Sequence, residues 1–475
     1  MLLRRLYDTK LAQASYLVGC QATGDALVID PNRDIEQYVA AARSEGLRIV
    51  FVTETHIHAD FVSGTRELAA KTGARPVLSG EGGADWSYAW AGDAGAMVAK
   101  DGDTFMVGNV KVDVLHTPGH TPEHISLRIT DTRATNQPMG VFTGDFLFVG
   151  DVGRPDLLER AAGIKGTMEA GARQLFASLQ RFKAYPDYLQ IWPGHGAGSA
   201  CGKALGAVPS STLGYERIAN WGLRADSEAD FVSEVLAGQP EPPAYFAHMK
   251  RINRDGPTIL GPRRPERQSA GALPALARTQ VVVDTRRTAD FATGHVAGTL
   301  NIPLGNSFPT YAGSILPYDR PIHLIVAEAS LDEALRALSS IGLDDVAGWS
   351  APEALESGGA LERTPQVTPA ELAARLAEGA VTVVDVRARS EWDEGHLPRA
   401  RLIPLGKVGA HADELAKAGP LVIQCESGSR SAIAASVLLA RGIVNIENLT
   451  GGFSAWKKAG LPVDHERGVT AGVRE

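Results

Sequence analysis

The segment RIVFVTETHIHADF, residues 48–61, decides the fold of the first part of the chain. RIVFVTE is rich in apolar and β-branched residues and predicts a buried strand, after which polar groups alternate. Comparable groups close three later apolar runs, HTPGH, FTGD and WPGHG, so that the set comprises His56, His58, Asp60, His120, Asp145 and His195. Imidazoles and carboxylates that converge from several strand ends suit a transition metal. The sequence therefore predicts a layered α/β domain with a metal site where strands end.

These motifs resemble the metallo-β-lactamase superfamily, whose pattern is HxHxDH, then TPGH, GD and a late His. The resemblance covers roughly residues 1–250 and implies an αββα sandwich. One position departs from the pattern, because Phe61 stands where the family has the final His of HxHxDH. In dinuclear members that His helps to hold the second metal, and a phenyl ring cannot coordinate one. A single-metal site is therefore expected.

Among single-metal members, the chain is most similar to the persulfide dioxygenases, which place Fe(II) on two His and one Asp. That resemblance implies one Fe(II) held by His56, His120 and Asp145, with open positions for substrate and oxygen. Zinc is the alternative metal, because such ligands accept it as well. The remaining members of the set, His58, Asp60 and His195, would then support the ligands or belong to a second site.

Two further residues are candidates for handling sulfur or substrate. Cys201 lies six residues after His195 and is either a small buried hydrophobic group or a thiol that handles sulfur near the metal. Arg154 belongs to a GRxD element with Asp156, similar to that of the persulfide dioxygenases, and either forms an ion pair or contacts the substrate. We expect Cys20 in the core, and structural roles for His116 and His124.

The segment LVIQCESGSRSAIAASVLLARG near the C-terminus predicts a strand, a loop from Cys425 to Arg430, and an Ala-rich helix. Loop amides and a helix N-terminus form a positive pocket that favours a thiolate or an anionic persulfide. Together with DVRARSEWDEGH before it, the segment resembles a rhodanese domain. This implies that Cys425 is the sulfur-carrying nucleophile, that Arg430 binds anions, and that the loop residues Glu426, Ser427, Gly428 and Ser429 cradle the persulfide.

An internal repeat precedes this loop. VVVDTRRTADFATGHVAGTLNIPLG, residues 281–305, matches residues 383–406, which predicts two copies of one α/β module. Aligning HLIVAEAS with LVIQCES places Ala327 at the Cys425 position and Asp332 at the Arg430 position. The first copy would therefore be an inactive rhodanese-like module that serves as a spacer or docking surface.

The predicted domains are a dioxygenase domain at 1–252, a linker at 253–270, a degenerate rhodanese-like domain at 271–362 and an active rhodanese domain at 363–475. The 475 residues carry 47 basic and 55 acidic side chains, and this net charge of −8 argues against a nucleic-acid or anionic-membrane partner. Three cysteines are too few for a disulfide framework, and no secretory leader is expected. We expect a cytoplasmic protein, and a homo-oligomer is compatible with the sequence.

The favoured hypothesis is a persulfide dioxygenase coupled to a sulfurtransferase. A low-molecular-weight thiol persulfide would be oxidised by dioxygen to sulfite, and a Cys425 persulfide would pass sulfur to sulfite, which gives thiosulfate. The reverse direction of sulfur flow stays open, as does the choice of thiol carrier. The alternatives are a zinc-dependent thioester hydrolase of the glyoxalase II kind, which would need two metals, and a non-catalytic sulfur sensor.

Overall fold

The structure, a computed structural model, describes residues 1–162, 166–203, 205–261, 264–353, 355 and 360–465. The chain divides into two compact units, Met1–Pro262 with Ser339–Gly342, and Arg263–Leu338 with Leu343–Glu475. Within the described residues, no helix combines the length and the apolar character that crossing a membrane requires.

The first unit contains two six-stranded sheets. The first has the order β1-β2-β3-β4-β5-β6, with β1 (Leu2–Asp8), β2 (Gln13–Cys20), β3 (Asp25–Ile29), β4 (Arg48–Thr53), β5 (Arg75–Ser79) and β6 (Met97–Ala99). The second has the order β12-β11-β10-β9-β8-β7, with β7 (Thr104–Val107), β8 (Val110–His116), β9 (Ile125–Asp131), β10 (Gly140–Gly144), β11 (Gln190–Pro193) and β12 (Ser211–Thr212). The helices are α1 (Glu36–Ser44), α2 (Thr65–Thr72), α3 (Leu157–Ala162), α4 (Thr167–Phe182), α5 (Leu213–Ala219), α6 (Trp221–Arg224), α7 (Glu228–Leu236) and α8 (Phe246–Asp255).

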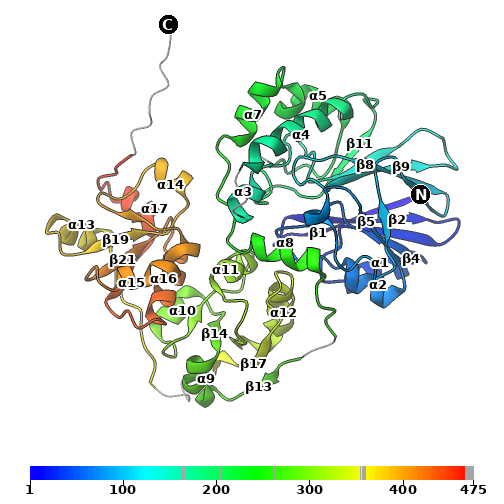
Figure 1. Ribbon diagram of the computed structural model, residues 1–475. Helices are drawn as coiled ribbons and strands as arrows, with labels where there is room; N and C mark the ends of the chain where they lie inside the picture. The colour runs from blue at the N-terminus through cyan, green and yellow to red at the C-terminus, as the bar shows by residue number, and fades with distance from the viewer. Residues whose placement is uncertain (163–165, 204, 262–263, 354, 356–359, 466–475) are drawn as a thin grey trace, which may run out of the picture. The chain divides into compact units, whose positions relative to one another are not determined.

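Successive side chains along a strand point to opposite faces of its sheet, and in both sheets the side chains on both faces are largely apolar. Val18 and Leu127 belong to a core cluster that joins the two sheets. On the opposite face of the first sheet, Val28 packs with Tyr38 of α1 and with α2, while α4 and α7 cover the second sheet. Figure 1 shows these helix layers on either side of the sheets. Each fully buried large apolar side chain contributes about 1.5–3 kcal/mol. The layers confirm the predicted αββα sandwich.

The second unit contains two five-stranded sheets of the same topology. The first has the order β13-β17-β16-β14-β15, with β13 (Glu266–Arg267), β14 (Val281–Asp284), β15 (Leu300–Asn301), β16 (Ile322–Ile325) and β17 (Val346–Ser350). The second has the order β18-β22-β21-β19-β20, with β18 (Gln366–Val367), β19 (Thr382–Asp385), β20 (Arg401–Leu402), β21 (Leu421–Gln424) and β22 (Ile446–Leu449). The helices are α9 (Leu273–Thr279), α10 (Thr288–Thr293), α11 (Phe308–Ile315), α12 (Leu331–Ser339), α13 (Pro369–Ala377), α14 (Arg389–Asp393), α15 (Ala412–Leu415), α16 (Ser429–Leu439) and α17 (Gly452–Lys458).

Strand register corrects the alignment of the two repeats by one residue. Asp284 pairs with Ile325 in the first sheet, and Asp385 pairs with Gln424 in the second. The residue after Ile325 therefore corresponds to Cys425, so that Val326, and not Ala327, holds the nucleophile's position. By the same offset Leu331, and not Asp332, corresponds to Arg430. The first repeat still lacks both a thiol and a cation at these positions.

Arg399 lies in the left-handed backbone region, with φ of 59°. The corresponding residue of the first repeat is Gly298, with φ of 81°, and glycine adopts this conformation without steric strain because it has no Cβ. We expect Arg399→Gly to stabilise the second unit by about 1 kcal/mol, since the left-handed conformation costs an L-residue roughly that much. Denaturant unfolding of the full chain measures the effect. Arg399→Ala keeps the Cβ and is the matched control; an equal gain in that variant would contradict the backbone explanation.

Candidate functional site

Three buried groups from different strand ends converge in the first unit. His56 follows β4, His120 follows β8 and Asp145 follows β10. The Asp145 Oδ2 atom lies 4.0 Å from His56 Nε2 and 3.7 Å from His120 Nε2. One ligand atom from each residue lies within 4.8 Å of the other two. This spacing suits three ligands on one face of a single metal ion.

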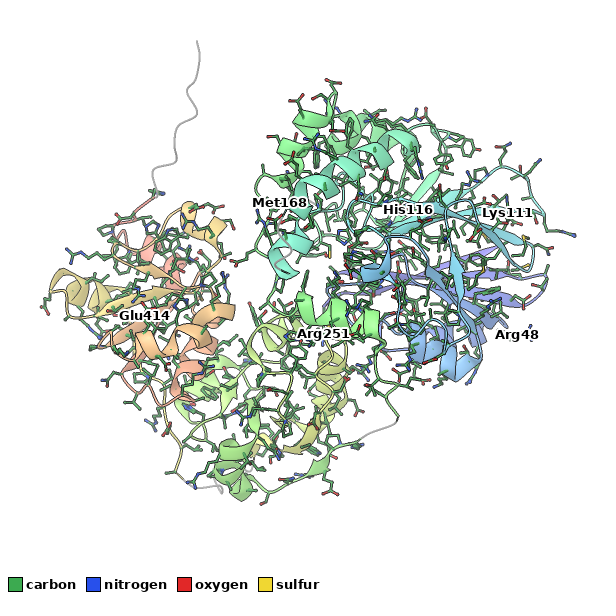
Figure 2. All side chains as sticks on the ribbon, viewed as in Figure 1. Arg48, Lys111, His116, Met168, Arg251 and Glu414 are labelled. Carbon is green, nitrogen blue, oxygen red and sulfur yellow. The ribbon has the colours of Figure 1, made fainter. Side chains whose placement is uncertain are left out.

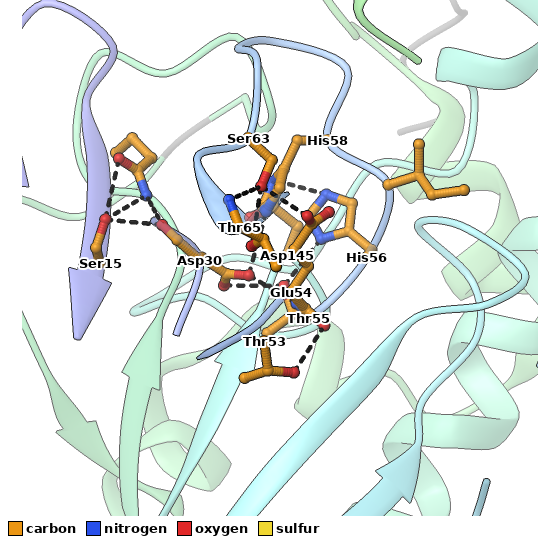
Figure 3. Close-up of polar contacts among 12 residues, drawn as sticks. Ser15, Asp30, Thr53, Glu54, Thr55, His56, His58, Ser63, Thr65 and Asp145 are labelled. Carbon is orange, nitrogen blue, oxygen red and sulfur yellow. Dashed lines mark hydrogen bonds and ion pairs between the residues drawn. The ribbon is translucent and has the colours of Figure 1, made fainter. Parts of the chain in front are cut away.

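Each imidazole is oriented by its other nitrogen. Thr55 Oγ1 lies 3.0 Å from His56 Nδ1 and donates to Asp30 Oδ2 at 3.0 Å (Figure 3). His120 Nδ1 lies 3.0 Å from the Arg154 carbonyl oxygen, so that it donates there. Both Nε2 atoms therefore keep their lone pairs for a metal, as in other histidine sites whose second nitrogen is anchored.

The protonation states suit metal binding. Burial lowers the pKa of His56 and of His120, so that both imidazoles are neutral near pH 7. Burial opposes ionisation of Asp145, but the neighbouring His195 holds the pKa of that carboxyl well below its usual range. Among the described side chains, Asp145 Oδ2 is a buried oxygen without a hydrogen-bond partner. Two neutral imidazoles and one carboxylate with a bare oxygen fit a divalent cation.

The other polar residues of this region lie around the three ligands. His195 bridges two carboxylates, with Nδ1 at 2.7 Å from Asp145 Oδ1 and Nε2 at 2.8 Å from Asp60 Oδ2. His58 Nε2 lies 3.1 Å from Asp30 Oδ1, which ties this ring to the same carboxylate as Thr55. Phe61 is fully buried, and its ring centroid lies 4.3 Å from that of His58. A phenyl ring thus fills the space beside His58 where the superfamily pattern has a ligand.

Cys201 lies with Asp60 and His195 in a second buried group, in which the ligand atoms are also within 4.8 Å of one another. Burial raises the pKa of Cys201 well above its usual value, and the carboxylates of Asp60 and Asp145 raise it further. The thiol is therefore protonated near pH 7. The structure brings Cys201 beside Asp60 and His195, where burial and the neighbouring carboxylates together disfavour the thiolate.

Arg154 is fully buried, and all three nitrogens of its guanidinium donate hydrogen bonds. It donates to both carboxylate oxygens of Asp156, at 2.9 and 2.8 Å, and to the carbonyl oxygens of Ala200 and Pro240. Of the two readings of this residue, these contacts favour the ion pair. The carbonyl oxygen of Arg154 accepts from His120, and its side chain donates to the carbonyl oxygen of Ala200, which precedes Cys201.

His116, His124 and Cys20 lie in structural positions. His116, which ends β8 and is labelled in Figure 2, has Nε2 at 2.8 Å from the Pro122 carbonyl oxygen. His124 Nε2 accepts from the Asp145 amide at 3.1 Å. Cys20 packs in the core between the two sheets. His124 thus fixes the backbone of a proposed ligand without being one.

The second unit holds the Cys425 loop between β21 and α16. The thiol is fully buried, and its Sγ accepts from the Gly428 amide at 3.2 Å and from Ser431 Oγ at 3.4 Å. Gly428 has φ of 93°, which a residue with a Cβ rarely adopts. Donors that converge on the sulfur are suited to stabilise an anionic sulfur species.

The charged residues of this loop form two ion-paired groups. Arg430 donates from both terminal nitrogens to Glu391, at 2.7 and 2.6 Å, and the paired carboxylate raises the pKa of Arg430. Glu426 pairs with Arg387 at 3.2 Å and accepts from Ser454 Oγ at 2.6 Å. Ser427 Oγ lies 3.4 Å from Ser429 Oγ. Arg430 is thus a fixed cation next to the thiol loop.

Sequence reasoning missed Asp30, Thr55 and Glu391. Asp30 is the hub behind both His56 and His58, and it lies in the left-handed region with φ of 49°. Strain of this kind in a non-glycine residue is typical of functional sites. Asp30 could have been recognised in the segment DALVIDP, because it follows an apolar run as the candidate ligands do. Glu391 gave none, because an acidic residue in a first helical turn is ordinary.

A buried carboxylate next to the metal ligands predicts a pH effect. Burial raises the pKa of Glu123 from 4.5 to about 7, and its Oε1 accepts from the Ile57 amide at 2.8 Å. The folded state therefore retains a proton that the unfolded chain loses, so that stability falls from about pH 4.5 to about pH 7. Glu123→Gln is expected to stabilise the chain above pH 7 by up to about 3 kcal/mol and to leave it unchanged near pH 4.5.

Urea unfolding at several pH values measures this effect, and Glu234→Gln on the exposed side of α7 is the control. A Glu123→Gln variant with the same pH dependence of unfolding as the parent chain would contradict the assignment.

Comparison with known proteins agrees with this geometry. A profile of the metallo-beta-lactamase superfamily matches residues 8–195, and a profile of the rhodanese-like domain matches residues 368–459. The chain is 34% identical over 185 residues to a hydroxyacylglutathione hydrolase of Rhodospirillum rubrum, covering 38% of this chain and 60% of the relative. It is 30% identical over 200 residues to the mitochondrial persulfide dioxygenase ETHE1 of Bos taurus, covering 41% and 68%.

A crystal structure of a metallo-beta-lactamase from Staphylococcus aureus subsp. aureus COL aligns with a TM-score of 0.69 and 45% identity, over 74% of this chain and 99% of that one. The chain belongs to the metallo-beta-lactamase superfamily. It also carries a rhodanese-like domain at its C-terminal end. The chain spans about three-fifths of the length of the hydroxyacylglutathione hydrolase that it matches.

Proposed function

We propose that the chain is an iron-dependent persulfide dioxygenase coupled to a sulfurtransferase. The observation that carries the proposal is the buried group of His56, His120 and Asp145, in which both imidazoles are anchored and the carboxylate has one bare oxygen. The proposal assigns oxygenation to residues 1–252 and sulfur transfer to residues 363–475. Residues 271–362 are assigned to a degenerate rhodanese-like module, joined to the first domain by a linker at 253–270.

Two observations favour a mononuclear oxygenase over a thioester hydrolase. Phe61 occupies the place beside His58 that a dinuclear site would need for a ligand. His58 itself is tied to Asp30. Two His and one carboxylate on one side leave positions for other molecules, which is the pattern of non-haem Fe(II) oxygenases. Bound Fe(II) would supply the redox chemistry with dioxygen, and zinc would not.

The proposed first reaction converts a thiol persulfide, dioxygen and water into the parent thiol, sulfite and two protons. The sulfane sulfur is oxidised and dioxygen is reduced. The chain's residues hold the reacting centre in a buried site, where His195 and the ionised Asp145 have fixed charges. Fixed charges in such a site need little reorganisation during reaction.

The proposed second reaction uses Cys425. The Cys425 thiolate attacks the outer sulfur of a thiol persulfide, whose sulfur–sulfur bond breaks to release the parent thiolate. Sulfite then attacks the outer sulfur of the Cys425 persulfide, the sulfur–sulfur bond breaks, thiosulfate leaves and Cys425 remains as the thiolate. The Gly428 amide and Ser431 hydroxyl donate to that sulfur, and Arg430 supplies a neighbouring positive charge. Linking both reactions in one chain raises the effective concentration of the sulfur intermediate. Three free cysteines in a chain of 475 residues support a reducing, cytoplasmic setting.

A paired substrate assay distinguishes the two enzyme classes. Anaerobically Fe(II)-loaded and Zn(II)-loaded preparations are each given glutathione persulfide with dioxygen and, separately, a glutathione thioester. We expect oxygen uptake only from the iron form with persulfide, and no thioester hydrolysis above background by either form. Thioester turnover by the zinc form, without oxygen uptake by the iron form, would instead support the hydrolase.

A further inference from the structure

A cavity of about 390 Å³ lies beside the Cys425 loop, within the second unit. Ser427, Gly428 and Ser429 of the loop line it on one side. Thr288 and Thr293 of α10, which belongs to the first repeat, line it on another. The repeat without a thiol therefore contributes directly to a cavity at the sulfur-carrying loop of the other repeat. The proposed reactions give this cavity no role.

The lining of the cavity is polar and uncharged. The residues described as lining it carry hydroxyl groups, amides or small side chains, and none of them is charged. Asn448 and Thr364 are each only 5% exposed, and both line the cavity. Asn448 Oδ1 and Thr364 Oγ1 are buried atoms without a hydrogen-bond partner. Buried polar atoms of this kind are normally satisfied, and the described residues leave the hydrogen-bonding capacity of these two unused.

The hydrogen-bond pattern limits which chemical groups an occupant of the cavity can carry. Asn448 Nδ2 donates to Gln366 Oε1 at 2.9 Å, which leaves Asn448 Oδ1 as an acceptor that needs a donor. Sulfite and thiosulfate dianions offer acceptors only, and a cavity of about 390 Å³ has the size of an organic-ligand site. An amide group can donate its N–H to Asn448 Oδ1 and accept from Thr364. Ser429, in the first turn of α16, lines the same cavity.

We infer that this cavity binds the amide-bearing body of a low-molecular-weight thiol, with α10 of the first repeat as one of its walls. Gly428 lines the cavity and its amide donates to Cys425 Sγ at 3.2 Å, so that the occupant contacts the loop that holds the sulfur. The inference deepens the proposed function, because it rests on a thiol carrier being the substrate. It gives the first repeat a substrate-binding role that survives the loss of its nucleophile.

The test uses two unreactive thioethers, S-methylglutathione and S-methylpantetheine, in separate calorimetric titrations of the full chain. Ala292→Phe places a large side chain in the cavity from α10. Asp290→Asn is the matched control, because Asp290 is an exposed residue of the same helix. We expect at least one thioether to bind, its affinity to fall more than about tenfold in Ala292→Phe, and no change in Asp290→Asn. Thr293→Val, which removes only a hydroxyl, is expected to weaken binding less.

Transfer of sulfur from thiosulfate to cyanide shows that the Cys425 loop of each variant is folded. The inference is overturned if neither thioether binds, or if Ala292→Phe binds both thioethers like the parent chain. It is also overturned if Ala292→Phe weakens the binding of sulfite and leaves that of the thioethers unchanged. Oxygen uptake with glutathione persulfide reports separately on the proposed function. If the parent chain consumes no oxygen but binds a thioether, and Ala292→Phe abolishes that binding, the dioxygenase is rejected and the binding role of the cavity stands. If the parent chain consumes oxygen and Ala292→Phe leaves thioether binding unchanged, only the binding role of the cavity is rejected.

Discussion

Replacing Asp145 with Asn is expected to abolish metal binding and oxygen uptake by the first unit. Asp145 Oδ2 faces both His56 Nε2 and His120 Nε2, at 4.0 and 3.7 Å, so that the variant loses the one anionic ligand of the proposed site. Loss of a supporting residue alone commonly costs 10–100-fold in metal affinity, so we expect loss of the ligand to cost more than about 100-fold. Metal content after dialysis against Fe(II) under anaerobic conditions measures the effect.

The matched control is Asp113→Asn. Asp113 is another buried carboxylate of the second sheet, but it pairs with Arg128 and lies outside the group of candidate ligands. We expect this variant to keep its metal. Full metal content in Asp145→Asn, with a native circular dichroism spectrum, would show that the ion binds elsewhere.

Replacing Cys425 with Ser is expected to lower sulfur transfer more than about a thousandfold, because a hydroxyl oxygen cannot carry the sulfane sulfur as a persulfide. The donors to this atom, the Gly428 amide and Ser431 hydroxyl, remain in place and can hold the serine oxygen. The fold should therefore survive. Thiosulfate formation from glutathione persulfide and sulfite measures the loss.

Oxygen uptake by the same Cys425→Ser protein should stay at the parent level, with sulfite replacing thiosulfate as the product. Cys20→Ser is the control, since Cys20 packs between the two sheets of the first unit. Residual thiosulfate formation at the parent rate would remove Cys425 from the pathway and direct attention to Cys201.

The sequence was most informative where spacing and chemistry coincide. Alternating His56 and His58 after an apolar strand, with later TPGH and GD motifs, predicted a metal site at strand ends, and the family resemblance of these motifs implied the sandwich and the set of His56, His120 and Asp145, which the structure brings together. The internal repeat predicted two modules, and the structure shows two sheets of identical strand order. The strands, their polar ends and the repeat depend on local patterns, which a single sequence records.

Other features depend on contacts between distant segments. Asp30 reaches Thr55 and His58 through a strained turn, and Glu391 reaches Arg430 across the domain, so neither could be recognised from its neighbours. The sequence alignment placed Ala327 opposite Cys425, one residue away from the correct Val326, for a similar reason. The strands of the two repeats have similar apolar sequences, and only their pairing with neighbouring strands fixes the register. Side-chain hydrogen bonds likewise decided between the two readings of Arg154.

Dioxygenase activity is tested by oxygen consumption of the Fe(II)-loaded protein on addition of glutathione persulfide, with sulfite and thiosulfate quantified at the end. We expect one dioxygen to be consumed for each sulfur recovered as sulfite or as the oxidised sulfur of thiosulfate, and no uptake by Asp145→Asn. A folded, iron-loaded protein that consumes no oxygen with this substrate would contradict the proposed dioxygenase activity.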